Sequence, residues 1–210
     1  HGYVLLEFFF KHLVESSLLG FQPEPLLDVP ARNVRQIVTP TQNRFALRLW
    51  AQMLIPLLAR DHDLVHFCKN LTVAGVPTKT VVTVYDLTTL ILPHLFPRAD
   101  VLYWRWIQPR MLSRVDRIIS ISQTTARDLI RFYGLSRDRI AVIYATYGAR
   151  FAPVDEIEIQ RVRDKYELPK EVLLNVGRID PKNNISTLVR AYARFREGNA
   201  FAGKLVLVGG

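Results

Sequence analysis

The chain lacks the residues on which several classes of protein depend. Its 210 residues contain one cysteine, Cys68, which excludes an internal disulfide and is typical of a reducing compartment. The five histidines and the cysteine show no spacing typical of a metal site. No internal repeat, low-complexity tract or heptad pattern is present. The sequence therefore predicts a globular protein without a metal site.

Long apolar runs are also missing. Runs such as Tyr3 to Leu6 and Phe8 to Phe10 are interrupted by Glu7 and Lys11, and no run approaches the roughly 20 apolar residues that span a bilayer. No signal peptide is evident, and because the chain begins with His1, the natural N-terminus is expected to lie upstream. We expect a soluble, cytoplasmic protein.

Lysine is absent from residues 98–150, yet this stretch is strongly basic. The whole chain carries a formal net charge of +9, and ten arginines against four aspartates give this stretch a net charge of +6. Such an excess attracts phosphate, whether in nucleic acid, in an anionic membrane or in a phosphorylated small molecule. The alternative is a solvated face that only keeps the protein soluble.

What is present is an alternation of strand and helix patterns. Helices are predicted over Tyr3–Val14, Asn43–Leu58 and Thr125–Tyr133, and a helical, aromatic and basic segment runs to Val115. Strands are predicted over Val34–Val38, Leu64–Phe67, Thr80–Tyr85, Arg117–Ile121 and Ile140–Ile143. Strands separated mostly by helices form a parallel sheet covered on both faces, so the sequence predicts an α/β, Rossmann-like, doubly wound domain.

The pattern changes after Pro153. Residues 153–168 are rich in charge and are predicted to form a linker with a short helix. A β-α-β unit follows over 169–210, with strands at Val172–Val176 and Lys204–Val208 and a helix from Ile185 to about Arg196. Two strands and one helix cannot enclose a core. We therefore expect an N-terminal domain over 1–152 and the incomplete start of a second Rossmann-like domain.

Two cations stand where the strand Val172–Val176 passes to the next helix. Gly177 lets the backbone approach a ligand, Arg178 offers a planar fork for phosphate oxygens, and Lys182 adds a mobile charge. In parallel sheets, ligands bind at the carboxyl ends of strands, where helix N-termini favour anions. The alternative is an ordinary strand-to-helix turn with exposed basic residues.

These motifs occur in a familiar order. The segment LLNVGRIDPKNNISTLVRAYARF resembles the start of the C-terminal domain of family-four retaining glycosyltransferases, enzymes of the GT-B fold. Upstream, the resemblance continues through DLVHF, VVTVYDLTTLILPHLFP, DRIISISQTTARDLIRFYGLSRDRIAVIYATYG and LRLWAQMLIPLLAR. HGYVLLEFFFKHL resembles the family's first helix, which follows a glycine-rich turn. The resemblance covers nearly the whole chain, and it rests on the ordered set rather than on one motif.

The resemblance implies a site for the diphosphate of a sugar donor. The family's Gly-Arg pair, whose arginine holds the donor diphosphate, matches Gly177 and Arg178. The family's following lysine falls at Asn183, and the lysine of this chain, Lys182, is displaced by one residue. One residue turns a side chain by about 100° on a helix, so Lys182 is expected either to reach the same phosphate or to point to solvent.

At the acceptor side the chain departs from the family pattern. The family's His-Asp pair, which lies near the donor sugar and the acceptor, is Tyr85-Asp86 here. These two are the predicted catalytic residues, although tyrosine is a poor proton shuttle near neutral pH and Asp86 is equally suited to forming a turn. Gly2, His66 and Ser122 are predicted to line the cleft. The alternatives are a structural role for His66 and a helix-start hydroxyl for Ser122.

The reaction implied by the resemblance is transfer of a sugar from a nucleotide-diphosphate sugar to a carbohydrate or lipid-linked acceptor, with retention and without a metal or other cofactor. Such a reaction belongs to glycan, polysaccharide or glycolipid synthesis. The family's paired glutamates, which hold the donor's sugar and ribose, do not occur before Gly210. The chain is therefore expected to be either a fragment of a longer enzyme or inactive.

Two further classes stay open. A non-catalytic binding module is suggested by Tyr85 and Asn183, which replace the family's histidine and lysine. A nucleic-acid-binding protein is suggested by the arginines, but no helix-turn-helix, zinc or RNA-binding signature is present. We therefore expect no nucleic-acid partner.

The arginines also suggest contact with a membrane. Arg110, Arg114 and Arg117 are spaced to share one helix face if the helix extends that far, with Trp106 four residues before Arg110. Arginine beside tryptophan suits the boundary between lipid headgroups and acyl chains, and the resemblance to enzymes with lipid-linked acceptors agrees. We expect either peripheral contact with the inner face of an anionic membrane, or buried tryptophans beside solvated arginines.

Overall fold

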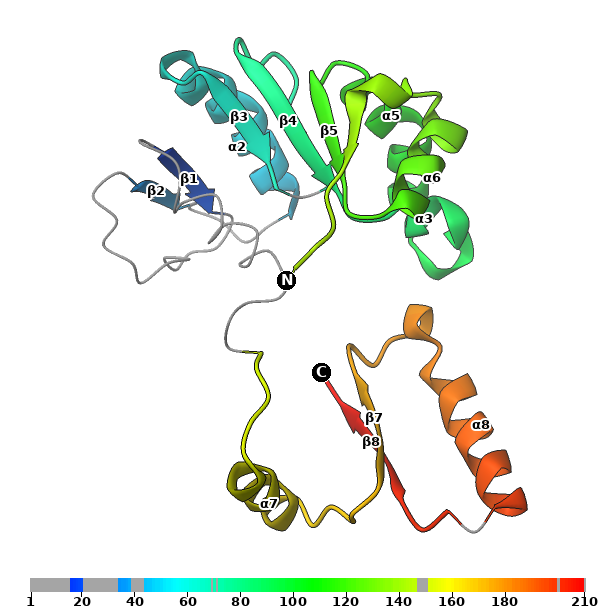
Figure 1. The fold of residues 1–210 in the computed structure, drawn as a ribbon. Coiled ribbons are helices and arrows are strands. Elements are labelled where there is room, and N and C mark those ends of the chain that lie inside the picture. The colour runs from blue at the N-terminus through cyan, green and yellow to red at the C-terminus, as the bar shows by residue number, and fades with distance from the viewer. Residues whose placement is uncertain are drawn as a thin grey trace. The chain divides into compact units, whose positions relative to one another are not determined.

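The computed structural model describes residues 16–20, 34–38, 44–68, 70, 72–146, 151–199 and 201–209 (Figure 1). It divides the chain into two compact units, His1–Gly148 and Ala149–Gly210, and each is described by itself. The helix predicted over Tyr3–Val14 lies outside the described residues.

A four-stranded parallel sheet forms the centre of the first unit. Its strands lie side by side in the order β3 (Leu64–Phe67), β4 (Lys79–Val84), β5 (Arg117–Ser120) and β6 (Ile140–Val142). Because all neighbours are parallel, the carboxyl ends of the strands lie at one edge, where Ser120 is opposite both Val84 and Val142. The predicted parallel α/β architecture is confirmed.

A separate pair of strands precedes this sheet in the chain. β1 (Ser16–Gly20) and β2 (Val34–Val38) pair in parallel over five residues each. The prediction of β2 is confirmed. β1 was not predicted, because Ser-Ser-Leu-Leu-Gly contains no β-branched or aromatic residue that would mark it as a strand.

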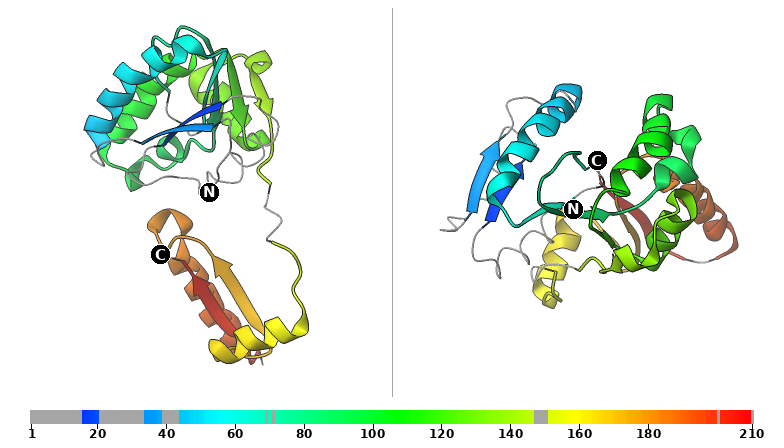
Figure 2. Two further views of the ribbon diagram at one scale, coloured as in Figure 1. Left: turned by 90° about the vertical axis from the view of Figure 1, so that its left-hand side faces the viewer. Right: turned by 90° about the horizontal axis from the view of Figure 1, so that it is seen from above.

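Helices cover one face of the four-stranded sheet. They are α2 (Arg44–Leu58), η1 (Ala59–Asp61), α3 (Thr88–Ile91), η2 (Pro93–Leu95), α4 (Arg98–Leu102), the π-helical η3 (Tyr103–Ile107), α5 (Gln108–Leu112), α6 (Gln123–Tyr133) and η4 (Arg137–Arg139). Figure 2 shows α2 and the helices that connect β4 to β5 and β5 to β6 on the same side of the sheet. Right-handed crossovers that advance in one direction along a sheet place their helices on one face.

The core of the first unit lies between the sheet and these helices. Val82 and Ile118, neighbours on β4 and β5, are fully buried and pack with Leu112 of α5 and Leu129 of α6. The same cluster also contains Val84, Leu87, Val115, Ala126, Leu135 and Ile140. Gly134, which follows the predicted helix Thr125–Tyr133, closes α6 with a φ of 63°.

The buried side of α2 is not the side with the largest residues. Ala51 and Ile55 are buried, whereas Leu49, Met53 and Leu57 are exposed. Both sets recur every four residues, so the spacing predicts the helix, which is confirmed, but not which side is buried.

The segment between β4 and β5 ends differently from the prediction. α5 ends at Leu112, Arg114 follows in a turn, and Arg117 begins β5. The condition under which Arg110, Arg114 and Arg117 would share one helix face, a helix that extends to Arg117, is therefore not met. The helix cannot continue to Arg117, because Ile118 is paired on both sides within the sheet.

Several arginines of the basic stretch stabilise the backbone of the first unit itself. Arg139 donates hydrogen bonds to the carbonyl oxygens of Leu112 (3.3 Å), Ser113 (2.9 Å) and Val115, where α5 ends and its last carbonyls need partners. Backbone carbonyl oxygens also accept from Arg110, Arg117 and Arg137. Part of the basic excess therefore has an internal structural role.

The second unit contains the predicted β-α-β arrangement. Its elements are α7 (Glu156–Lys165), β7 (Val172–Val176), η5 (Pro181–Asn183), α8 (Ile185–Gly198) and β8 (Lys204–Val208). β7 and β8 pair in parallel, and the Tyr192 hydroxyl of α8 donates to the carbonyl of Gly203 at 2.8 Å. None of the described residues of α7, β7, α8 or β8 is buried.

Candidate functional site

The carboxyl-end edge of the first sheet is held together at Tyr85, the first residue after β4. The backbone N–H of Tyr85 donates to Oδ1 of Asn70 at 2.7 Å, and its carbonyl accepts from the Thr125 hydroxyl at 2.9 Å. The side-chain amide of Gln108 in turn donates to the carbonyl of Asn70. One residue thus connects the loop after β3, the end of β4 and the start of α6.

Two polar atoms at this edge are buried without a hydrogen bond. They are the hydroxyl of Tyr85 and Oε1 of Gln108, and the Gln108 side chain is fully buried. Burial, and to a lesser degree the neighbouring Cys68, raises the pKa of Tyr85. Tyr85 is therefore uncharged at neutral pH and can donate a hydrogen bond.

The side chain of His66 contacts β4. Its Nε2 lies 2.8 Å from the Thr83 hydroxyl, and Sγ of Cys68 lies 3.9 Å from its Nδ1. Burial lowers the pKa of His66 and raises that of Cys68, so the imidazole and the thiol are both uncharged at neutral pH. These contacts agree with the structural role that was the alternative for His66.

Asp86 and Ser122 both make local backbone contacts. Oδ1 of the exposed Asp86 accepts from the N–H of Thr88 at 2.9 Å, as in a turn. The Ser122 hydroxyl accepts from the N–H of Thr125 at 3.0 Å and so caps α6. Thr125 therefore connects Ser122 to Tyr85, while Gly2 lies outside the described residues.

Sequence reasoning missed Asn70, Gln108 and Thr125. Asn70 contacts Tyr85, 15 residues away in the sequence, and Gln108 contacts Asn70, 38 residues away. Thr125 contacts Tyr85 across 40 residues. A polar residue soon after a strand was the available signal, and it applies to Asn70 alone. Gln108 and Thr125 carry no such signal, because they lie at the start of helices where polar residues are common.

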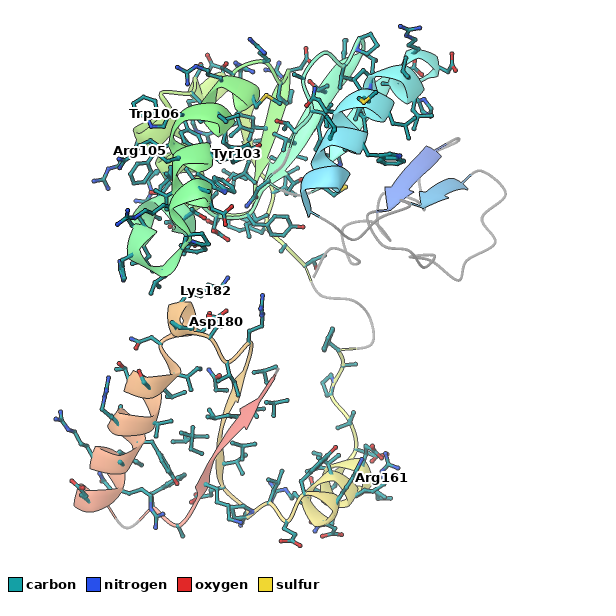
Figure 3. The ribbon with its side chains drawn as sticks, turned by 180° about the vertical axis from the view of Figure 1, so that it is seen from behind. Tyr103, Arg105, Trp106, Arg161, Asp180 and Lys182 are labelled. Carbon is teal, nitrogen blue, oxygen red and sulfur yellow. The ribbon has the colours of Figure 1, made fainter. Side chains whose placement is uncertain are left out.

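In the second unit, residues 177–184, called here the Arg178 loop, join β7 to α8. The N–H of Gly177 donates to the carbonyl of Val208 at 2.9 Å, which extends the β7–β8 pairing into the loop. Oδ1 of Asp180 accepts from the N–H groups of Lys182 (3.1 Å) and Asn183 (3.3 Å) and caps η5. Figure 3 shows Asp180 and Lys182 at this turn.

The predicted donor residues therefore lie together in one loop, but they differ in what they contact. The side chains of Arg178 and Lys182 are exposed and make no hydrogen bond or ion pair among the described residues. Asn183 instead donates from Nδ2 to the carbonyl of Arg178 at 2.6 Å. Two free cations thus stand beside the N-terminus of the 14-residue helix α8, whose dipole also favours an anion.

The described residues contain no group of three His, Cys, Asp or Glu side chains that could hold a metal ion. The chain has an Asp-x-Asp tripeptide, Asp61 to Asp63, but it precedes β3 and so lies at the edge of the sheet opposite the strand carboxyl ends. Among the helices that the structure describes, none is long and apolar enough to cross a bilayer.

The sequence matches a family model over residues 11–146, and the model is that of glycosyltransferase family 4. A serotype-specific mannosyltransferase, WbdA of Escherichia coli, is 33% identical over 124 residues, which are 57% of this chain and 15% of that protein. O-antigen chain mannosyltransferase B of Escherichia coli is 25% identical over 54% of this chain and 30% of its own length. D-inositol 3-phosphate glycosyltransferase of Acidothermus cellulolyticus is 35% identical over 48% of this chain and 23% of its own.

Two solved structures share the fold. A glycosyltransferase from Rickettsia africae aligns with a TM-score of 0.52 at 18% identity, over 84% of this chain and 47% of that one. The Anabaena protein HepE in complex with UDP-glucose aligns with a TM-score of 0.62 at 16% identity, over 83% and 46%. The chain thus spans less than half the length of each of these relatives and structures.

Proposed function

The chain belongs to glycosyltransferase family 4 and has the α/β architecture of the GT-B fold; from this membership we propose that the protein transfers a sugar from a nucleotide-diphosphate sugar to an acceptor, with retention of the anomeric configuration. The proposed acceptor is a growing glycan, since two of the similar proteins are named as mannosyltransferases of serotype or O-antigen chains. A hexose is the proposed sugar, and mannose is the first to test.

The observation that carries the proposal is the pair of unpaired cations in the Arg178 loop. A planar guanidinium suits bidentate contact with phosphate oxygens, and a lysine adds a point charge. When the glycosidic bond to the donor breaks, negative charge develops on the departing diphosphate. Arg178, Lys182 and the N-terminus of α8 would stabilise that charge without a metal ion.

A binding module without turnover is the second candidate. It is favoured by Tyr85, whose hydroxyl is a poor proton carrier at neutral pH and whose pKa burial raises further. Release of nucleoside diphosphate from a nucleotide sugar separates the two candidates. An enzyme releases it in the presence of acceptor, and a module binds the nucleotide sugar and leaves it intact.

The donor site is tested by replacing Arg178 in the intact protein. Calorimetric titration with UDP and with GDP is expected to show binding weaker by about 1.5–3 kcal/mol in Arg178→Ala, or roughly 10- to 150-fold. Arg194→Ala is the matched control, because Arg194 is also exposed but lies further along α8. Equal affinities of wild type and Arg178→Ala for both nucleotides would contradict the proposal.

We also propose peripheral contact with an anionic membrane through the first unit. Leu102, Trp106 and Ile107 are each at least half exposed on α4 and η3. Figure 3 shows Trp106 and Arg105 pointing away from the sheet. An exposed indole and aliphatic side chains beside a cation suit the headgroup region of a bilayer, which would place the protein at the inner face of the membrane.

A further inference from the structure

The peptide between Gly177 and Arg178 lies close against the backbone of Gly209. Gly209, which follows β8, has a φ of 152°, a conformation that side-chain-bearing residues rarely adopt. A Cβ at Gly209 would lie 1.9 Å from the carbonyl oxygen of Gly177 and 2.7 Å from its carbonyl carbon. Since a Cβ cannot lie so close to backbone atoms, any other residue at position 209 must displace this peptide.

The carbonyl side of Arg178 is held by a hydrogen bond from within the loop. The carbonyl of Arg178 accepts from Nδ2 of Asn183 at 2.6 Å, across five residues of chain. Asn183 is itself fixed, because its N–H is bonded to the side chain and the carbonyl of Asp180. The amide of Asn183 therefore closes the loop around Arg178 and is directed at the backbone.

We propose that Asn183 and Gly209 are positioning residues for Arg178 and that Asn183 is not itself a ligand of the phosphate. This inference rests on the proposed role of Arg178 in binding a diphosphate. A guanidinium on a long stem binds a diphosphate best when its own backbone has one fixed position, because less conformational freedom is lost on binding. The Arg178 loop gains this order from hydrogen bonds within the loop and from the pairing of Gly177 with Val208 of β8.

Two substitutions test the proposal in the intact protein, with inorganic pyrophosphate, UDP and GDP as probes. Asn183→Ala removes one hydrogen bond and is expected to weaken binding about threefold to tenfold. Gly209→Ala displaces the peptide that carries Arg178 and is expected to weaken binding by about tenfold to a hundredfold. Asn183→Gln, which keeps an amide donor on a longer stem, is expected to recover part of the loss.

Each variant has a matched control in the same unit. Nδ2 of Asn199 donates to the carbonyl of Phe195 at 2.9 Å, the same kind of bond at the other end of α8. A Cβ at Gly198 would have no neighbour within 4 Å. Asn199→Ala and Gly198→Ala are therefore expected to bind all three probes as wild type does. Thermal unfolding shows whether each variant is folded, and Asn183→Ala remains informative if Gly209→Ala is not.

A double substitution distinguishes positioning from direct contact. If Asn183 acts through Arg178, then Asn183→Ala has no further effect in an Arg178→Ala background. If the two losses add, Asn183 contacts the probe itself and the inference is wrong. It is also wrong if Arg178→Ala weakens binding while Asn183→Ala and Gly209→Ala match their controls. If Arg178→Ala has no effect, it is the proposed donor site that fails.

Discussion

The two units differ in where their apolar side chains lie. In the first unit, Leu129 of α6 is fully buried against the sheet with nine other core residues. In the second unit, the chemically identical Leu174 of β7 is 61% exposed, and the described residues of its helices and strands are all at least partly exposed. The same strand-helix-strand pattern thus gives a packed core in one unit and an open β-α-β arrangement in the other.

Because of this difference, we expect the first unit to determine the stability of the fold and the Arg178 loop to determine the binding of diphosphate. The first unit holds its strand ends with contacts that cross the fold, such as those of Asn70 and Thr125 with Tyr85. The Arg178 loop is ordered by short-range bonds of Asp180 and Asn183 and by its pairing with β8. We therefore expect substitutions in the first unit to change mainly the free energy of unfolding, and substitutions in the loop to change mainly the affinity for diphosphate.

The largest expected effect comes from replacing one leucine in each unit by alanine. Leu129→Ala is expected to lower the free energy of unfolding by about 2–5 kcal/mol, because it leaves a cavity in the core. Leu174→Ala is expected to change it by less than about 0.5 kcal/mol, as at an exposed position. Urea unfolding of the intact protein measures both. Equal losses would mean that β7 is buried in the intact protein and would remove the contrast.

A second expected effect concerns the exposed aromatic residues of the two units. Arg105→Ala is expected to weaken binding to anionic vesicles by about 1 kcal/mol, and Trp106→Ala by at least as much, because its indole would lie among the headgroups. Tyr166→Ala is the control in the second unit, since Tyr166 is exposed and also lies beside a cation, Lys165. Sedimentation with vesicles measures all three. Loss of binding in Tyr166→Ala alone would contradict the membrane surface proposed for the first unit.

The smallest expected effect is a dependence on pH that only the first unit shows. Burial holds the pKa of His66 below its ordinary value of 6.5, so the unfolded chain binds more protons than the folded unit as pH falls through that value. The free energy of unfolding is therefore expected to fall between about pH 7 and pH 5, and to fall less in His66→Gln. His94→Gln, at an exposed position, is the control.

Residues 149–210 contain no histidine, so hydrogen exchange in the second unit is expected to show no such loss of stability over the same range. A pH dependence in His66→Gln as steep as that of wild type would show that another group is responsible.

The strands and most helices were predictable because their periodicity is a local property. The strands from Leu64 to Val142 and the β-α-β unit after Leu168 appear where alternation and β-branched residues indicate them. The exact end of the helix before β5 was not predictable: the helical pattern runs to Val115, whereas α5 ends at Leu112, where Arg139, distant in the sequence, binds the last carbonyls. The spacing of Arg110, Arg114 and Arg117 fits one helix face only if the helix reaches Arg117, which instead begins β5.

The candidate site was predictable only in part. Gly177, Arg178 and Lys182 follow from the place where a strand meets a helix, a local pattern, and their role in binding stays a prediction. Asn183 follows from the resemblance as a contact of the diphosphate, whereas its bond to the Arg178 carbonyl depends on the folded shape of the loop. The contacts of Asn70 and Gln108 at the end of β4 depend on tertiary structure, and only Asn70, a polar residue soon after β3, has a local signal in the sequence.

Hydrogen exchange of the intact protein with and without a nucleoside diphosphate tests the central claim most directly. If the Arg178 loop binds the diphosphate, backbone amides of residues 177–184 are expected to become protected when UDP or GDP is added, while those near Asn199 do not change. The strands β4 and β5 are expected to be protected in both conditions, because most of their residues are buried and each strand is paired on both sides. Saturating nucleotide that leaves exchange in residues 177–184 unchanged would contradict the account.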